Sequence, residues 1–435
     1  MLKPLTCALL LACVAPAHAA DWQRDFFSPM TNELPPTRGA VVDDLGYVHL
    51  QAFNRHAWAQ THDMVHQYTL DADGNVPWIW GLSQAEGISD CGVHARSGQR
   101  LDCVLRSDWS GPYVQLEMRA RTGSDVRWQA VLPADAQLRA VSIPDEDAAL
   151  VAAELDTGNG PEITIFAIAP WGSVEVISVA PACPQAGQVL RASSFAMPQD
   201  ASGAIRHAKA CWNSFGTTDL IVEELDRWSG QWTPLATQPL GFGEDIERIA
   251  AAADGSAYAL TRTTDGMQRQ LWSTQPWSPW WQPQWFHPEG EAVAFETGAG
   301  GLLAALRGAW PGGSPPVLAW VARQSGGWPQ FRMFPQLGDA ASFEVKMSAL
   351  GDAVVLRRDD AGGLQEERLE LARPDGMLLP VASLALAPGE IALGSTHALP
   401  TPDGGVVVAR TVQGSAEFGP DAIGVRVQRY ALPAP

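Results

Sequence analysis

Short runs in which apolar and polar residues alternate, separated by turns rich in glycine and aspartate, recur along this chain. The stretch QYTLDADGNVPWIW, residues 67–80, shows the pattern clearly. Its apolar side chains alternate on both sides of an Asp-Gly-Asn turn, which is typical of two β-strands joined by a tight turn. We therefore predict a β-hairpin in this stretch and repeats of it further along the chain.

Comparable turns recur at nearly constant spacing after Gly74. They are marked in order by Gly123, Gly172, Gly230, Pro279, Gly327 and Gly376. The successive spacings are 49, 49, 58, 49, 48 and 49 residues, and the longest one spans the segment that contains Cys183 and Cys211. A nearly constant period with four short strands in each unit is typical of a β-propeller, whose blades bury their faces against neighbouring blades.

The second strand of six units is also recognisable, as a run of small and branched apolar residues. These runs begin at Tyr47, Leu150, Ala257, Leu302, Ala353 and Val406. The ends of the chain predict one further unit. Residues 423–430 alternate as a third strand, and residues 22–27 precede the first inner strand, residues 39–42, in the position of a fourth.

The seven turns alone would fit seven blades, but the terminal strands favour eight. We predict an all-β fold, a single eight-bladed β-propeller over residues 20–435 made of four-stranded antiparallel blades. The N-terminal outer strand would pair with the C-terminal blade, which closes the ring and removes a free sheet edge.

The repeated units resemble the PQQ-like repeats of bacterial eight-bladed propellers, in which a turn with Asp and Gly leads into a Trp. Three turns carry this resemblance: Asp73-Gly74 with Trp78, Gly123 with Trp128, and Asp226 to Gly230 with Trp232. The turns at Gly172 and Gly376 lack the following Trp. The resemblance implies either a quinone-dependent dehydrogenase or a non-catalytic envelope scaffold. No cofactor-site motif accompanies it, so we expect the fold without a cofactor.

Residues 1–19 have the features of a secretory leader. Lys3 precedes an apolar run from Leu5 to Val14, and Ala17-His18-Ala19 is a cleavage signal. In an alternative interpretation the chain is a lipoprotein, because Leu10 to Cys13 loosely matches a lipid-attachment box and would anchor the chain at Cys13. No other run approaches the roughly 18 apolar residues that a membrane span needs. We expect a periplasmic or secreted protein with no transmembrane segment.

Four cysteines remain after the leader, an even number that favours disulfides in an exported chain. Cys91 and Cys103 flank a turn at Ser97, and Cys183 and Cys211 flank a turn-rich segment at residues 198–203. We predict the pairs 91–103 and 183–211. A metal site is the alternative, but the chain has no Cys-x-x-Cys motif.

Composition and charge narrow the class of partner. The chain is 18% charged and contains 41 Gly and 33 Pro, which suits short strands joined by turns. Its net charge is -19, and it becomes -20 once Lys3 leaves with the leader. Such an acidic surface repels nucleic acid and anionic lipid, so the expected partner is a protein or a glycan.

The candidate site lies on the loops that join second to third strands and fourth strands to the next blade, because these loops share one face of a propeller. Its aromatic, imidazole and carboxylate residues are His56, Trp58, His62, Asp63, Trp109, Phe215, Phe242, His287, Trp310 and Phe418. Aromatic rings gathered on one face stack on sugar rings or anchor a peptide. In the alternative interpretation, each ring only caps the apolar end of its own blade.

Three local patterns have both a functional and a structural interpretation. His62 and His66 would share a zinc ion only if their loop curled, whereas an extended strand keeps them roughly 13 Å apart. Residues 71–75 begin like a calcium loop but lack the distal glutamate, which favours a plain hairpin turn. The Trp-rich segment 275–288 forms either inter-blade packing in the fifth blade or an exposed adhesive edge. We expect no metal.

The chain has no nucleophile elbow, no His-Glu-x-x-His and no phosphate loop. The first hypothesis is therefore a non-catalytic propeller scaffold that recognises a protein or a glycan through the aromatic loop face. The alternative is a carbohydrate-active enzyme, a glycoside hydrolase or lyase, with carboxylates such as Asp63 or Asp108 at the channel mouth. A quinone-dependent dehydrogenase ranks third.

Overall fold

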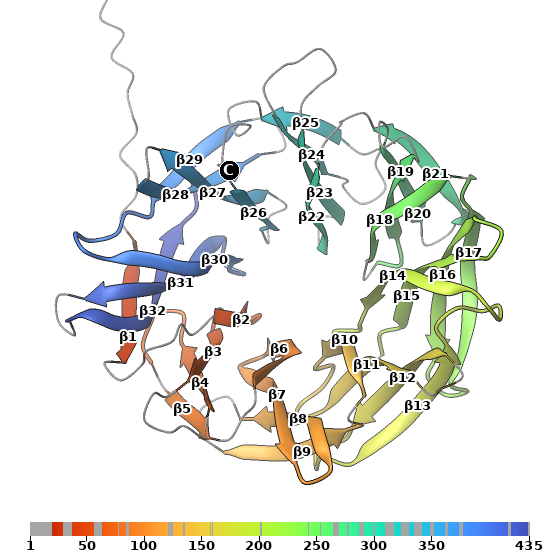
Figure 1. Ribbon diagram of the computed structural model, residues 1–435, viewed down its shortest axis with the longest axis horizontal. Helices are drawn as coiled ribbons and strands as arrows, with labels where there is room; N and C mark the ends of the chain where they lie inside the picture. Colours follow the sequence, from red (N-terminus) through yellow and green to blue (C-terminus); the bar gives the residue numbers. More distant parts are fainter. Residues whose placement is uncertain are drawn as a thin grey trace, which may run out of the picture.

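In the computed structural model all regular elements of the described residues are β-strands (Figure 1). The structure describes residues 20–28, 37–55, 63–76, 78–83, 87–120, 125–133, 135–156, 158, 160–200, 202–241, 243–252, 254–263, 269–275, 278–286, 291–298, 301–308, 317–322, 330–334, 342–348, 352–361, 364–373, 377–415 and 419–433. The predicted leader lies outside these ranges. The described part contains no helix that is long and apolar enough to cross a bilayer.

The described strands form eight four-stranded antiparallel sheets, which we number in chain order. Sheet 1 contains β2 (Thr37–Val42), β3 (Val48–Arg55), β4 (Asp63–Leu70) and β5 (Trp78–Ser83). Sheet 2 contains β6 (Gly87–Arg96), β7 (Gln99–Asp108), β8 (Gly111–Arg119) and β9 (Val126–Leu132). Sheet 3 contains β10 (Gln137–Ser142), β11 (Ala149–Asp156), β12 (Pro161–Ile168) and β13 (Val174–Pro181). Sheet 4 contains β14 (Val189–Ala196), β15 (Ile205–Trp212), β16 (Thr218–Asp226) and β17 (Gln231–Pro239).

The remaining sheets follow the same order. Sheet 5 contains β18 (Glu244–Ala251), β19 (Ala257–Thr263), β20 (Arg269–Gln275) and β21 (Ser278–Phe286). Sheet 6 contains β22 (Glu291–Gly298), β23 (Gly301–Gly308), β24 (Val317–Ala322) and β25 (Gln330–Phe334). Sheet 7 contains β26 (Ser342–Met347), β27 (Ala353–Ala361), β28 (Leu364–Ala372) and β29 (Leu378–Ser383). Sheet 8 contains β30 (Ile391–Pro400), β31 (Gly405–Ser415), β32 (Gly419–Ala431) and β1 (Trp22–Ser28).

The sheets stand around a central axis like the blades of a propeller, with the first strand of each innermost (Figure 1). All six predicted second strands are confirmed as β3, β11, β19, β23, β27 and β31. The predicted turn at Pro279 is wrong by a few residues. Gln275 and Ser278 are paired in the register, so Pro279 lies inside β21. A fourth strand tolerates proline because its outer edge has no ladder for the missing N–H to join.

The ring closes through β1, as predicted from the two ends of the chain. β1 pairs antiparallel with β32 in sheet 8, with Phe26 opposite Val425. The Trp22 indole donates to the Ala72 carbonyl oxygen at 3.0 Å, and Arg24 Nε donates to the Gly74 carbonyl oxygen at 2.6 Å. A Cβ on Gly74 would lie 2.5 Å from the Trp22 ring, so this turn needs glycine to approach sheet 8.

Apolar side chains gather between neighbouring sheets rather than within one central core. Between sheets 2 and 3, Leu116 and Met118 of β8 pack in one cluster with Val151 of β11 and Phe166 of β12. Similar clusters join sheets 3 and 4, 4 and 5, 5 and 6, 7 and 8, and 8 and 1. Trp281 of the Trp-rich segment lies in the cluster between sheets 4 and 5, which agrees with the packing interpretation.

The structure confirms the Cys183–Cys211 disulfide, whose Cα atoms are 5.8 Å apart. Cys183 lies on the connection from β13 to β14, and Cys211 lies on β15, so the bond ties the entry of sheet 4 to its second strand. Cys103 is also disulfide-bonded. The side chain of Cys91, its predicted partner, lies outside the described residues, so that pairing stays a prediction.

Candidate functional site

Trp109 is exposed at the tip of the turn between β7 and β8, the second and third strands of sheet 2. Its side chain is 97% exposed. The turn is held by Asp108, whose Oδ1 accepts hydrogen bonds from the Ser110 amide at 2.7 Å and from the Ser110 hydroxyl at 2.6 Å. A large ring on a turn with fixed hydrogen bonds presents apolar surface to solvent at little cost in backbone entropy.

Phe215 occupies the equivalent turn of sheet 4, between β15 and β16, and is 84% exposed. Asn213 Oδ1 accepts from the amides of Phe215 and Thr217 at 3.0 and 3.1 Å. The side-chain nitrogen of Asn213, Nδ2, also donates to the Thr217 hydroxyl at 2.7 Å. Neither Phe215 nor Trp109 caps its own sheet, so for these two rings the capping interpretation is wrong.

The other predicted site residues are not described. His56, Trp58, His62, Phe242, His287, Trp310 and Phe418 lie outside the described residues. Asp63 begins β4, but its side chain is not described. The predicted histidine cluster therefore stays a prediction. Within the described residues, no group of three or more His, Cys, Asp or Glu is arranged to hold a metal ion.

Asp108 and Asp71, two acidic residues considered in the sequence analysis, accept hydrogen bonds within their own turns. The hydrogen bonds from Ser110 lower the pKa of Asp108, which is solvent-exposed, so this carboxylate is ionised near neutral pH and ill-suited to act as a general acid. In the hairpin at residues 71–75, Asp71 Oδ1 accepts from the amides of Asp73 and Asn75 at 3.0 and 2.7 Å. This is the geometry of a plain Asp turn, the interpretation favoured from the sequence.

Two exposed tryptophans on the opposite face do not appear in the predicted site. Trp171 lies between β12 and β13 and is 76% exposed, and Trp228 lies between β16 and β17 and is 99% exposed. Both occupy turns between third and fourth strands. The signal was present in the sequence, because each Trp stands one or two residues before a glycine of the repeat, Gly172 or Gly230.

A polar cleft opens on this same face, at the junction of sheets 2 and 3. Its volume is about 400 Å³. Three segments line it: the β6–β7 turn, the two ends of the β8–β9 connection, and the β10–β11 connection. The lining residues are Arg96, Ser97, Gln99, Ala120, Arg127, Ile143, Pro144, Asp145, Glu146 and Asp147. The sequence did not predict this cleft.

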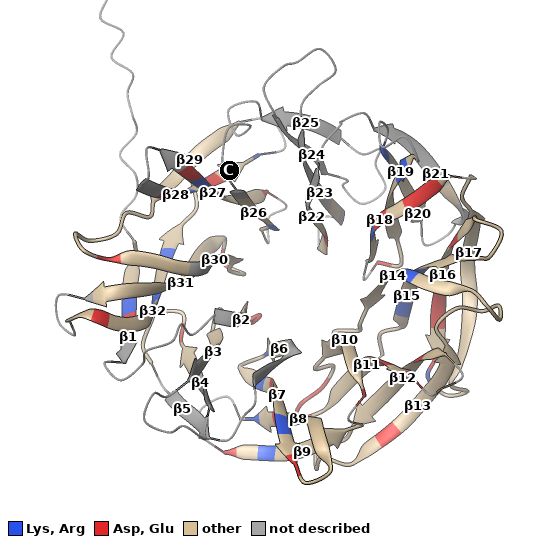
Figure 2. Cartoon of the chain, in the orientation of Figure 1, with Lys and Arg blue, Asp and Glu red and all other residues tan. Residues whose placement is uncertain are grey.

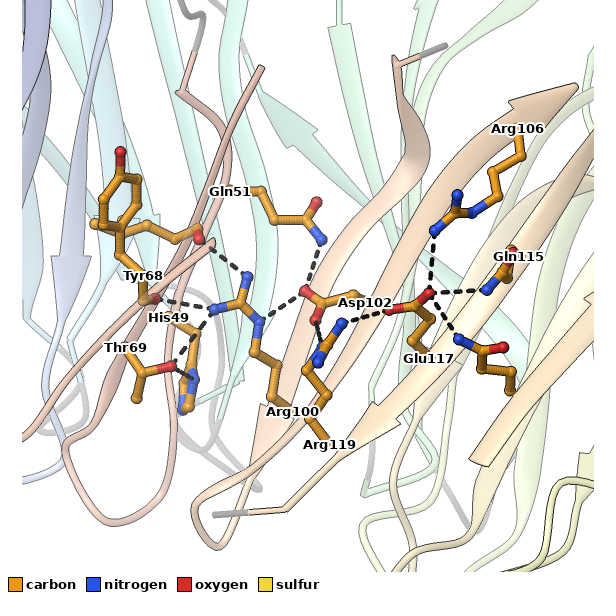
Figure 3. Close-up of polar contacts among 12 residues, drawn as sticks. His49, Gln51, Tyr68, Thr69, Arg100, Asp102, Arg106, Gln115, Glu117 and Arg119 are labelled. Carbon is orange, nitrogen blue, oxygen red and sulfur yellow. Dashed lines mark hydrogen bonds and ion pairs between the residues drawn. The ribbon is translucent and has the colours of Figure 1, made fainter. Parts of the chain in front are cut away.

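A buried ionic network joins sheets 1 and 2 (Figure 3). At its centre, Arg100 Nε donates to Asp102 Oδ1 at 2.6 Å. The two terminal nitrogens of Arg100 donate to the carbonyl oxygens of Tyr68 at 2.9 Å and Leu50 at 3.0 Å. Gln51 Nε2 reaches across from sheet 1 and donates to Asp102 Oδ1 at 2.6 Å.

The network continues outward along β7 and β8 (Figure 3). Arg119 Nη2 donates to Glu117 Oε2 at 2.6 Å, while Arg119 Nε lies 3.4 Å from Asp102 Oδ2. Glu117 Oε1 accepts from Arg106 at 3.3 Å and from Gln115 at 2.8 Å. The side chains of Asp102 and Glu117 are fully buried and paired with arginines, so neither carboxylate can reach a substrate. The network holds two sheets together and is not an active site.

A second buried polar group lies in sheet 4. His207 Nδ1 is 3.0 Å from Glu223 Oε1, and Lys209 Nζ donates to the same oxygen at 2.6 Å. The His207 ring stacks on Phe195 at 4.1 Å. Burial lowers the pKa of His207 more than Glu223 raises it, so the ring stays neutral near pH 7.

The charged residues that the structure describes are of mixed sign around the ring. Several described sheets contain both acidic and basic residues (Figure 2). Most of the basic groups that are buried are paired with carboxylates, as in the network between sheets 1 and 2. Among the described residues, acidic and basic groups are therefore interspersed rather than segregated.

Comparison with known proteins finds similarity to solved structures only. No protein-family model and no curated protein matches the chain. A polysaccharide lyase, Uly1, is 10% identical over 95% of this chain and 100% of its own, with a TM-score of 0.48. The WD40 domain of SCAP from fission yeast is 10% identical over 94% and 98%, with a TM-score of 0.49. A prolyl endopeptidase is 11% identical over 88% and 55%, with a TM-score of 0.45. The fold itself is described from the sheets, which stand around one axis as the blades of a β-propeller do. The three similar structures combine enzymes with a WD40 domain.

Proposed function

We propose that this chain is a non-catalytic binding scaffold that recognises a protein or a glycan through the face of its second-to-third strand turns. The observation that carries the proposal is the pair Trp109 and Phe215, which are 97% and 84% exposed on turns of sheets 2 and 4. Aromatic side chains of this kind dominate the energetics of binding surfaces, because they bury large apolar area at little entropy cost.

The proposal includes the overall organisation of the protein. We take the eight described sheets as the eight blades of one propeller domain that covers residues 20–435. The Cys183–Cys211 disulfide favours an oxidising compartment, in line with a periplasmic or secreted protein. The binding face would also include the predicted residues of the 56–63 loop.

The carbohydrate-active enzyme is not favoured by a specific observation. Asp108, its described carboxylate candidate, holds the Trp109 turn through Ser110. The fully buried Asp102 and Glu117 are paired with arginines. A scaffold needs none of these groups for chemistry.

The test begins with two probe classes, a glycan array and a phage-displayed peptide library, each screened against the wild-type protein. The selected glycan or peptide is then titrated by calorimetry against the double variant Trp109→Ala, Phe215→Ala. We expect the affinity to fall at least tenfold, since two anchors of the contact are removed.

Trp228→Ala is the matched control, because it removes an equally exposed ring from the opposite face. It should leave the affinity unchanged. Full affinity in the double variant, or chemical turnover of the selected glycan, would contradict the proposed function.

A further inference from the structure

The polar cleft at the junction of sheets 2 and 3 has the size and the fixed walls of a ligand site. Its volume of about 400 Å³ lies within the range of small-molecule sites. Arg96 Nη1 donates to the carbonyl oxygens of Ile143 and Pro144 at 2.9 and 3.0 Å, which ties the β6–β7 turn to the β10–β11 connection.

A second set of contacts fixes the same wall. Gln99 Nε2 donates to Asp147 Oδ1 at 3.2 Å, and the Asp147 amide donates back to Gln99 Oε1 at 3.2 Å. The Trp128 indole donates to the Asp147 carbonyl oxygen at 2.5 Å. These bonds within the protein hold the cleft wall in place, so binding would need little reorganisation.

The cleft also contains polar groups that the fold does not use. Arg127 and Glu146 are exposed and make no side-chain hydrogen bond to another described residue. Asp145 is exposed as well, and the one hydrogen bond described for its side chain is a local one, accepted from the Glu146 amide at 2.7 Å. Hydrogen-bond donors and acceptors therefore face the same space.

Trp171 is not a lining residue of the cleft, but its turn packs against Trp128, which is hydrogen-bonded to the cleft wall. Its neighbour Gly172 has a positive φ of 85°, and a Cβ at that position would lie 2.9 Å from Trp128 Cβ. The turn of Trp171 thus packs directly on Trp128, which in turn donates to Asp147 of the cleft wall. Trp171 itself remains 76% exposed.

The chemistry of the cleft selects among ligand classes. An apolar ligand would leave the polar groups of the lining without hydrogen-bond partners. A strongly anionic ligand would be repelled by the carboxylates of Asp145, Glu146 and Asp147. A cationic peptide would meet Arg96 and Arg127 in the same space. A neutral sugar suits it best, since its hydroxyls both donate and accept and its ring face stacks on tryptophan.

We propose that this cleft is a binding site for a neutral glycan, with Trp171 stacking on a sugar ring and Arg127, Glu146 and Asp145 bonding its hydroxyls. The site lies on the face opposite Trp109 and Phe215. It is therefore independent of the proposed function, and a failure of one leaves the other standing.

The test is calorimetric titration of the wild-type chain with four neutral oligosaccharides: cellohexaose, xylohexaose, mannohexaose and chitohexaose. We expect at least one of them to bind. Trp171→Ala should raise its Kd about tenfold, the change that corresponds to losing about 1.4 kcal/mol of contact. The double variant Arg127→Ala, Glu146→Ala should bind the same oligosaccharide more weakly, because it removes hydrogen bonds to the sugar hydroxyls.

Trp228→Ala is the matched control, because Trp228 is an exposed tryptophan on the same kind of turn in the next sheet. It should leave the Kd within about twofold of wild type. Circular dichroism would verify that each variant is folded, which is expected because the altered side chains are exposed.

Three results would overturn the proposal. The first is that none of the four oligosaccharides binds at millimolar concentration. The second is that Trp171→Ala retains wild-type affinity or that Trp228→Ala loses as much. The third is that a hexa-arginine or hexagalacturonate comparator binds through these residues more tightly than every neutral glycan, which would assign the cleft to a charged ligand.

Discussion

Replacing Asp102 by asparagine tests whether the buried network between sheets 1 and 2 stabilises the ring. Asp102→Asn keeps the size of the side chain and removes its charge. Arg100 is 2% exposed, so its guanidinium would stay buried without its ionic partner. The new amide group would also place a donor near Arg119 Nε, which lies 3.4 Å from Asp102 Oδ2.

The burial of the Arg100–Asp102 pair determines how much stability the substitution should cost. Breaking a buried ion pair by removing one partner costs about 3–5 kcal/mol, because it leaves an uncompensated charge out of water. The Arg139–Glu154 pair has nearly the same length, 2.7 Å against 2.6 Å, but its side chains are 39% and 18% exposed. Glu154→Gln should therefore cost only about 0–1 kcal/mol.

Urea unfolding followed by tryptophan fluorescence and circular dichroism would compare the two variants with wild type. The midpoint should shift clearly for Asp102→Asn and hardly at all for Glu154→Gln. If both variants lost the same small amount, burial would not control the strength of these pairs and the reasoning would fail.

Two further predictions concern stability. Replacing both Cys183 and Cys211 by alanine opens a loop with a sequence separation of 28 residues. By loop entropy, this should lower the free energy of unfolding by about 3.6 kcal/mol. The urea midpoint under non-reducing conditions should fall, and an unchanged midpoint would contradict this prediction. Burial lowers the pKa of His207 in the folded chain, whereas in the unfolded chain a histidine has a pKa of about 6.5. Below that pH the unfolded chain binds a proton that the folded chain does not. Stability therefore falls as the pH falls from about 7 to 5. His207→Gln should show a shallower fall in this window, in which Glu223 remains ionised, and an equally steep fall would refute the role of His207.

The repeat followed from local signals, and the closure of the ring followed from the incomplete units at the two ends of the chain. Strand alternation and turn residues act over a few positions, so the spacing of the turns was enough to predict the second strands and the pairing of β1 with the C-terminal sheet. The positions of Trp109 and Phe215 on second-to-third strand turns were predicted for the same reason, whereas the structure decided that both rings are exposed rather than capping their own sheets.

The surroundings of each sheet face were decided only by the tertiary structure. In β7 the polar positions Arg100 and Asp102 alternate with Leu101 and Cys103, a pattern that by itself indicates a solvent-exposed face. In a ring both faces of a sheet are covered by neighbours, so these charges are buried and meet Gln51, which is 51 positions away from Asp102. Because such pairs form only when neighbouring sheets pack, no local pattern could predict the network.

Of the two candidate binding surfaces, one could be located from the sequence and the other only from the tertiary structure. The sequence by itself determined the repeated strands and the aromatic turns, because each depends on residues close together in the chain. It also predicted the closure, because a strand at each end of the chain was left without a complete unit. Only the tertiary structure decided that the turns of sheets 2 and 3 enclose a polar cleft beside Trp171. The physical reason is that a cleft is bounded by segments about one repeat apart, and their relative positions are set by the packing between sheets.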